Sequence, residues 1–301
     1  GVQLSQPIDR VYVFDRAQWI EANLMSFQAL FAPLEEFYTE VSSRQGALAM
    51  VVGQVNSQIV GAQMGALIGF LARRVLGQYD LGLLSPDPQM RGALYFVEPN
   101  IARVRAQLGL HDEDFRLWIT LHETSHVFEF EAFPWVREYF QDLLRQFLGQ
   151  VTNQFSALGI NLARMIERLV QGEPLDQHWI ELMLTPDQQR IFARMQALMS
   201  LIEGYSNHIM NAIGGRLLPS YQQIEDRIRQ RQLRRPLLEE AFNRVTGMDL
   251  KLAQYQQGEA FINAVVAARG PAFANRVWER AEHLPTMEEI RDPKRWIARM
   301  E

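Results

Sequence analysis

Apolar residues recur along most of the chain with the spacing that forms one face of an α-helix. Two short stretches instead have the β-branched and aromatic character of strands, "VYVFD" (11–15) and "ALYFVEPN" (93–100). The helical pattern predicts long helices over 16–44, 46–76, 136–171, 186–213 and 218–246. We therefore expect a mainly α-helical fold with one or two short strands. No repeat or linker divides the pattern, so a single domain over residues 1–301 is predicted.

Several residues predict where helices begin and end. Asp15 and Asn100 are expected to cap helices that begin at residues 16 and 101. Thr286 and Glu289 have the spacing of a capping box. Pro134 is expected to end or bend the helix that opens in "HDEDF" (111–115), and "GQYD" (77–80) is expected to be a turn at a helix end.

The stretch from Gln45 to Ala72 carries no charged residue, and its glycines recur every four residues (Gly61, Gly65, Gly69). In lipid such a ladder forms a face for helix association. However, polar residues interrupt the stretch, and its apolar part from Met64 to Ala72 is too short to span a bilayer. We expect a buried helix whose glycines let another helix approach closely, with a membrane-associated protein as the alternative.

The amino-acid composition argues against several classes of function. The net charge of −5 and the pI near 5.8 argue against a nucleic-acid surface, which would need an excess of lysine and arginine. The chain has no cysteine, which excludes disulfides, thiolate metal sites and cysteine nucleophiles. Any metal ion must therefore bind to His, Asp or Glu. This composition fits a reducing cytoplasm, and residues 1–15 lack the order of a signal peptide.

The segment "TLHETSHVFEF" (120–130) carries the most specific pattern for chemistry. His122 and His126 lie one helical turn apart and about 40° apart around the axis, so both imidazoles can bind one ion. Glu123 points about 100° away and can reach a water molecule on that ion. Zinc would lower the pKa of this water, and Glu123 would accept its proton during hydrolysis of an amide. The alternative is a pair of polar residues on a buried helix, but burying them without partners would be costly.

A zinc site of this type needs a third protein ligand, which we expect to be Glu203. This residue follows an apolar helical run, where a carboxylate needs a cation or several donors. His208 is a weaker candidate, because it lies about 140° away around the same helix. A structural alternative for Glu203 is an ion pair with Arg194 or Arg73.

Other polar residues are candidates for supporting roles. Glu129 is about 10 Å from His122 along the helix, too far to share the ion, so we expect it to support a ligand or to face solvent. Asn207 lies one turn after Glu203 and could orient a ligand. Tyr205, His208 and Tyr255 are candidate donors to a developing oxyanion, although each could be structural. The remaining histidines are expected in loops or caps, and no pattern in the sequence indicates a partner for them: His111, His178 and His283.

Four blocks of the chain resemble the zincin-like metallopeptidase family found mainly in actinobacteria and chloroflexi: "GAQMGALIGFLARRVLGQYD" (61–80), "HETSHVFEFEAFPWVREYF" (122–140), "LIEGYSNHIMNAIG" (201–214) and "GMDLKLAQYQQGEAFI" (247–262). The resemblance covers nearly the whole chain. It implies an α-rich zincin-like domain with one zinc ion on His122, His126 and Glu203, with Glu123 as the general base. The chain departs from the common glutamate-ligand zincins in one respect, because 77 positions separate His126 from Glu203.

The resemblance implies a zinc-dependent hydrolase, specifically a metallopeptidase acting on a peptide or amide substrate. The alternative is a catalytically inactive scaffold or binding protein in which the metal is structural or absent. Glu123 argues against this alternative, because a structural metal site needs no base beside its ligands. The pattern gives no indication of the oligomeric state.

Overall fold

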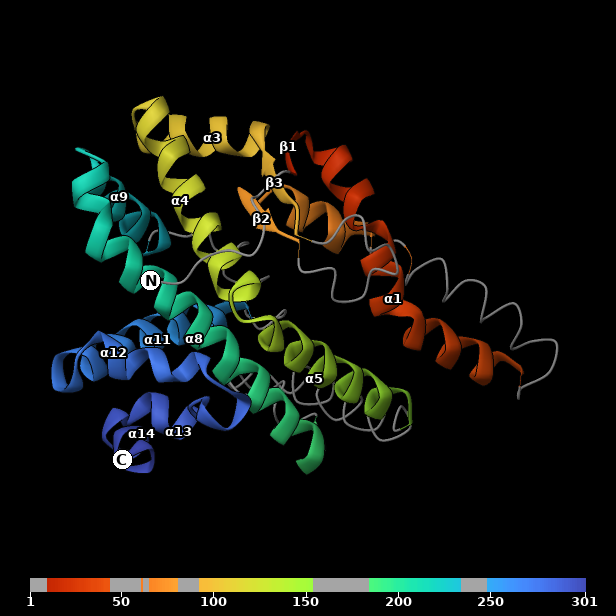
Figure 1. Cartoon of the computed structure of the whole chain (residues 1–301). Helices are drawn as coiled ribbons and strands as arrows, with labels where there is room; N and C mark the ends of the chain where they lie inside the picture. The colour runs from red at the N-terminus through yellow and green to blue at the C-terminus, as the bar shows by residue number, and fades with distance from the viewer. Residues whose placement is uncertain (1–9, 44–60, 62–64, 81–91, 154–183, 234–247) are drawn as a thin grey trace, which may run out of the picture.

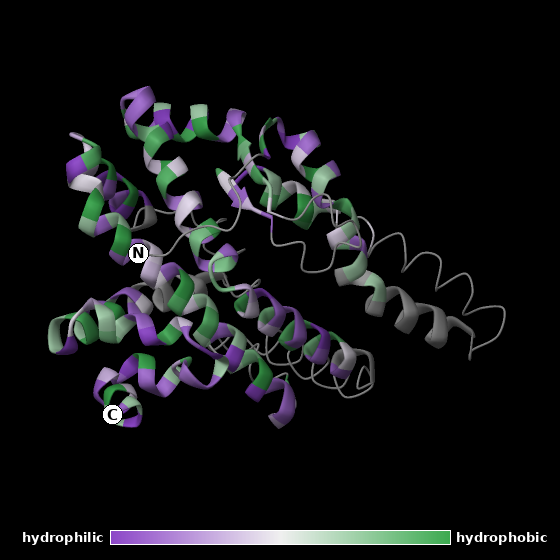
Figure 2. Ribbon diagram, viewed as in Figure 1, coloured by the Kyte–Doolittle hydropathy of each residue, from purple (hydrophilic) through white to green (hydrophobic). Residues whose placement is uncertain are grey.

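The structure is a computed structural model that describes residues 10–43, 61, 65–80, 92–153, 184–233 and 248–301 (Figure 1). Within these residues the chain is mainly α-helical and carries one small sheet, as predicted. Figure 2 shows hydrophobic and hydrophilic residues mixed along most helices, in agreement with the amphipathic pattern. No helix in the described part is long and apolar enough to cross a membrane.

The sheet has three short strands in the order β1-β3-β2. Strand β1 (Val11–Phe14) pairs in parallel with β3 (Leu94–Val97), and β2 (Gly77–Tyr79) pairs antiparallel with the other edge of β3. The expectation of a helix-end turn at "GQYD" (77–80) is therefore wrong. Three residues carry too little periodicity to indicate a strand, and the pairing that stabilises β2 involves a segment distant in sequence.

The helices at the N-terminal end follow the predicted boundaries with one exception. Helix α1 (Arg16–Ser43) begins after Asp15, whose Oδ1 accepts a hydrogen bond from the Gln18 N–H at 2.8 Å, which confirms the predicted cap. Helix α3 (Glu98–Leu108) begins before Asn100, so the predicted cap at Asn100 is wrong. The buried Asn100 side chain instead donates to the carbonyls of Ala72 and Val75, 2.7 Å away in each case.

The glycine ladder lies partly outside the described residues, which include a helical stretch over 65–72. A Cβ atom placed on Gly61, Gly65 or Gly69 would meet no described atom within 4 Å. The close helix approach expected at this ladder is therefore not found in the described part. Such a close approach is instead found between Gly204 and Gly258, a pair that the sequence pattern did not single out.

Four long helices surround the region of the HETSH segment. Helix α4 (Asp112–Glu131) ends just before Pro134, which begins α5 (Pro134–Asn153). Helix α8 (Pro186–Leu217) crosses the molecule and packs against α4, α5 and α11 (Met248–Arg269) (Figure 1). A Cβ atom on Gly204 would lie only 2.2 Å from the main chain of Gly258, so α8 and α11 touch backbone to backbone. Helix α9 (Tyr221–Leu233) follows α8.

The C-terminal residues form short helical segments that pack on α8 and α11. These segments are α12 (Pro271–Ala274), the 3-10 turns η2 (Asn275–Trp278) and η3 (Ala281–His283), α13 (Met287–Arg291) and α14 (Pro293–Met300). The capping box between Thr286 and Glu289 forms as predicted. Fully buried Trp296 packs edge-on against Phe261 of α11, which joins this region to the main core.

Candidate metal centre

Helix α4 presents His122 and His126 to the neighbouring helix α8. Their ring centroids are 4.9 Å apart and their planes are nearly perpendicular, at 81°. The side chains are 20% and 12% exposed, so both are largely screened from solvent. The one-turn spacing in the sequence thus brings the two imidazoles together, as helix geometry requires.

Glu203 of α8 faces both imidazoles. Its Oε2 lies 3.8 Å from His122 Nε2, and its Oε1 lies 4.0 Å from His126 Nε2. One ligand atom from each of these three residues lies within 4.8 Å of the others. We call His122, His126 and Glu203 the His–His–Glu group.

The alternative partners considered for Glu203 do not contact it. Arg194 donates from Nε to the hydroxyl of Tyr139 at 3.0 Å. Among the described residues, neither Arg194 nor Arg73 forms an ion pair with Glu203, whose ionic contacts are the two histidines. The Glu203 carboxylate is therefore left facing the imidazoles without a permanent cation.

The orientation of His126 is set by a hydrogen-bond network behind the ring. Its Nδ1 lies 2.9 Å from Oε2 of Glu129, which is only 3% exposed. Ser206 Oγ lies 3.3 Å from both His126 Nδ1 and Glu129 Oε1, and Ser125 donates to Ser206 at 2.6 Å. Of the two expectations for Glu129, the structure shows support of a histidine rather than exposure to solvent. The network leaves Nε2 of His126 free to face Glu203.

The charges around His126 raise the pKa of its imidazole. Burial alone would lower the pKa of His126, but the hydrogen bond to Glu129 and the charges of Glu129, Glu203 and Glu123 raise it. A metal ion and a proton would therefore compete for this imidazole.

Glu123 is buried on the side of α4 that faces strand β2. The residue is 8% exposed, and the main chain of Tyr79 acts to lower the pKa of its carboxyl group. Burial raises the pKa of Glu123 to about 7, against the opposing charge of His126. A carboxylate with a pKa in this range can accept and release a proton near neutral pH.

His122 is held by an aromatic neighbour rather than by a hydrogen bond. Its ring stacks parallel on Trp118, with centroids 5.8 Å apart, and its buried Nδ1 has no hydrogen-bond partner among the described residues. Burial and the proximity of His126 lower the pKa of His122 to about 3, so the ring is neutral. A neutral imidazole is the form that binds a metal ion.

These observations test whether the residues fit a metal ion. Three carboxylates lie around two imidazoles, namely Glu123, Glu129 and Glu203, and no Lys or Arg in the described part forms an ion pair with any of them. The ligand separations of 3.8 and 4.0 Å are close to the roughly 3.4 Å between neighbouring ligand atoms of tetrahedral zinc. Two imidazole nitrogens and one carboxylate oxygen form a typical zinc ligand set. The group therefore fits a divalent ion of the zinc type.

Two of the other residues considered as donors have hydrogen-bond partners outside the His–His–Glu group. The Tyr205 hydroxyl donates to Asn275 at 2.5 Å, and His208 Nδ1 lies 2.6 Å from Asn263 Oδ1. Asn207 makes no hydrogen bond among the described residues, and Ser206 occupies the supporting position beside His126. Tyr255 lies in α11, but its side chain is outside the described part.

Two of the remaining histidines lie outside the group as well. His111 precedes α4, His283 lies in η3, and His178 is outside the described residues. His283, for which the sequence indicated no partner, accepts a hydrogen bond at Nε2 from Arg280 at 2.8 Å.

Sequence reasoning missed four residues of the centre. Trp118 lies one helical turn before His122, so its spacing could have indicated it. Ser206, Gly77 and Tyr79 reach the centre through contacts between elements distant in sequence, for which the chain carries no local signal.

The chain is similar to known proteins over nearly its whole length. The chain is similar to a crystal structure from Chloroflexus aurantiacus described as "a putative hydrolase with a novel fold", with 54% sequence identity and a TM-score of 0.70. The match covers 99% of this chain and 83% of the other. No curated protein matches the chain. The family model for zincin-like metallopeptidases matches residues 2–297, and the chain belongs to this family.

Proposed function

We propose that the protein is a zinc-dependent hydrolase that cleaves amide bonds in peptides. The observation that carries this proposal is the buried carboxylate of Glu123 beside the His–His–Glu group, on the same helix as two of the three ligands. The family and the similarity to a structure described as a hydrolase support the same reaction class. His122, His126 and Glu203 would hold one zinc ion, which supplies Lewis-acid activation of a water molecule and of the substrate carbonyl.

The side chains of this chain then have separate roles. Glu123 would accept a proton from the attacking water as the new bond from oxygen to the carbonyl carbon forms. It would return this proton to the leaving nitrogen as the C–N bond breaks, so that the carboxylate is regenerated. Glu129 and Ser206 would keep the His126 ring oriented throughout.

The proposal predicts that Glu123 is needed for hydrolysis but not for zinc binding. Glu123→Gln should retain about one zinc ion per chain, because the ligands are unchanged, and should lose hydrolysis by about 10²–10⁴-fold. Zinc content is measured by elemental analysis after desalting, and hydrolysis with a mixed peptide library read by mass spectrometry. Glu288→Gln, an exposed glutamate of α13, is the matched control and should behave as wild type.

Two outcomes would contradict the proposal in different ways. Full activity in Glu123→Gln would remove Glu123 as the base. Stoichiometric zinc without hydrolysis of any peptide by the wild type would favour the alternative, a scaffold or binding protein with a structural metal.

A further inference from the structure

Among the described residues, no strand pairs with the outer edge of β2. The Asp80 N–H donates to the Ala93 carbonyl at 2.8 Å, and the Val97 N–H donates to the Leu76 carbonyl at 2.9 Å. Paired residues of an antiparallel ladder alternate between bonded and non-bonded positions. Gln78 is therefore bonded to Tyr95 of β3, whereas the main-chain groups of Gly77 and Tyr79 point away from β3.

This outward edge lies against Glu123. The Tyr79 N–H points outward from the same edge as Gly77, and its interaction with the Glu123 carboxylate acts to lower the pKa of that group. A Cβ atom on Gly77 would lie 2.6 Å from Glu123 Cγ and 2.7 Å from its Oε1. The space taken by the glutamate side chain thus exists because residue 77 has no side chain.

Strand β2 is held against α4 and α5 by the side chain of Tyr79. The Tyr79 ring stacks on Phe130 of α4 with centroids 6.0 Å apart, and its hydroxyl donates to Glu131. Arg137 of α5 donates to both the Tyr79 hydroxyl, at 2.8 Å, and Glu131, at 2.5 Å. Tyr79 is only 7% exposed, so its position relative to α4 is fixed through its side chain while its main chain faces Glu123.

We propose that the outward edge of β2 positions the general base: the Tyr79 N–H holds the Glu123 carboxylate, Gly77 leaves the space for it, and the anchored Tyr79 ring fixes the strand. Gly77 and Tyr79 are positioning residues that act through Glu123. The catalytic consequence rests on the proposed hydrolase function, whereas the contact between β2 and Glu123 does not.

Amide hydrogen exchange tests the contact without any activity measurement. In the zinc-loaded full chain, the Tyr79 amide should be protected, although its N–H is not bonded to β3. Glu123→Ala removes the acceptor and should speed exchange of this amide at least about tenfold, whereas Glu123→Gln keeps an acceptor oxygen and should preserve protection. The Gln78 amide, which is bonded within the sheet, is the internal control and should not change.

The following outcomes would contradict the proposed contact between Tyr79 and Glu123. A Tyr79 amide that is unprotected in the wild type, or equally protected in Glu123→Ala, shows that Glu123 does not accept its hydrogen bond. Faster exchange of Gln78 and Tyr79 together in Glu123→Ala shows general loosening of the strand rather than the loss of one specific bond.

Kinetics test the catalytic consequence. Gly77→Ala should displace Glu123 and lower kcat about tenfold or more, with KM and zinc content unchanged, because a base displaced by about 1 Å loses most of its effect. Gly149→Ala is the matched control, since a Cβ atom there meets no described atom within 4 Å. An unchanged kcat in Gly77→Ala, or a change confined to KM, would contradict the positioning role. If the wild type hydrolyses no peptide, the proposed function fails and the exchange experiment alone decides the contact.

Discussion

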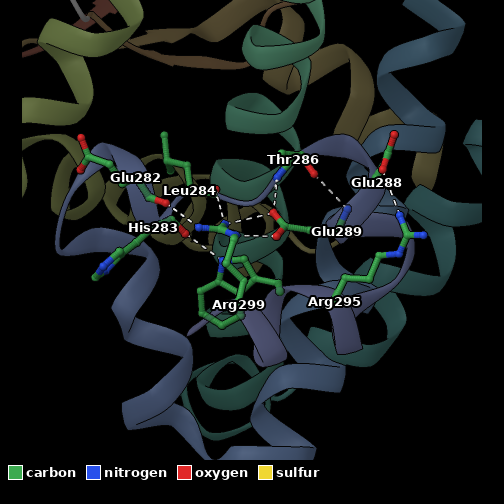
Figure 3. A network of polar contacts seen from close by, with 9 residues as sticks. Glu282, His283, Leu284, Thr286, Glu288, Glu289, Arg295 and Arg299 are labelled. Atoms are coloured by element: carbon green, nitrogen blue, oxygen red, sulfur yellow. Dashed lines mark hydrogen bonds and ion pairs between the residues drawn. The ribbon is translucent and has the colours of Figure 1, made fainter. Parts of the chain in front are cut away.

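Two polar clusters of this molecule are built on similar helical scaffolds but differ in how their charges are balanced. The C-terminal network consists of Glu282, Leu284, Thr286, Glu289 and Arg299 (Figure 3). Arg299 donates from Nε to Glu289 Oε1 at 2.6 Å, from Nη1 to the Glu282 carbonyl at 2.6 Å and from Nη2 to the Leu284 carbonyl at 3.0 Å. The Glu289 carboxylate also accepts from the Thr286 N–H at 2.8 Å, which completes the network.

In the candidate metal centre, by contrast, some polar groups have no hydrogen-bond partner among the described residues. Glu203 faces two imidazoles at distances longer than hydrogen bonds, and the buried Nδ1 of His122 has no partner among the described residues. Buried polar groups in proteins are almost always satisfied, so an exception calls for an explanation. The comparison indicates that the C-terminal network balances its charges within the protein, whereas Glu203 faces two imidazoles at the position where we propose that a cation binds.

The largest effect should follow from removing the carboxylate that bridges the two imidazoles. We expect Glu203→Ala to weaken zinc binding at least about 100-fold, measured by competition with a chelator. Zinc at 100 times its Kd should raise the stability of the wild type by about 2.7 kcal/mol, and the same zinc concentration should raise that of the variant by about 0.4 kcal/mol or less. Glu288→Ala, which removes an exposed carboxylate beside the C-terminal network, should leave both values unchanged. Equal zinc affinity in Glu203→Ala would move the third ligand to another residue.

Weakening the hydrogen bond that Glu129 makes with His126 should have a smaller effect on zinc affinity. Glu129→Gln keeps the shape of the side chain but replaces a charged acceptor with a neutral one at 2.9 Å from Nδ1. Loss of such a partner typically weakens metal binding by about 10–100-fold. The chelator competition used for Glu203 measures this effect, and Ser206→Ala should cost less because its hydroxyl lies 3.3 Å from the ring. An affinity that is lower in Ser206→Ala than in Glu129→Gln would reverse the proposed order of support.

Disruption of the C-terminal network should change stability without changing zinc binding. Arg299→Ala removes the donors shared by Glu289, Glu282 and Leu284. Because Arg299 is 40% exposed, we expect a loss of only about 1–2 kcal/mol in the free energy of unfolding. Urea unfolding gives this value, and zinc affinity is the control. A weakened zinc affinity in Arg299→Ala would show that the two clusters are coupled.

The parts of the structure that were predicted from sequence are those with local causes. The caps at Asp15 and Thr286 depend on residues three positions apart, and the two histidines meet because they lie one turn apart. Glu203 was identifiable because a carboxylate stands out in an apolar run. The geometry brings it to the histidines even though 77 positions separate it from His126.

The parts that were missed depend on contacts between distant segments. Asn100 has the sequence character of a cap, but its side chain bonds the carbonyls of Ala72 and Val75 in another segment. Strand β2 exists through its pairing with β3, and Ser206 reaches His126 only because α8 packs on α4. Such contacts leave no local pattern in either segment, so periodicity and capping rules do not detect them.

The smallest expected effect is a pH dependence confined to the C-terminal network. Burial alone would raise the pKa of Glu289, but the hydrogen bonds and charge of Arg299 and the Thr286 N–H hold it below its ordinary value of 4.5. A carboxyl with a lowered folded pKa contributes stability that is present above its unfolded pKa and is lost as pH falls through the folded one. We therefore expect the unfolding free energy to fall below about pH 4.5, and Glu289→Gln to reduce that slope. Urea unfolding of zinc-free protein at stepped pH measures the difference between wild type and variant, which removes the contribution of zinc release. An identical acid slope in Glu289→Gln would assign the pH dependence to other carboxylates and would show that the balanced network contributes no charge-dependent stability.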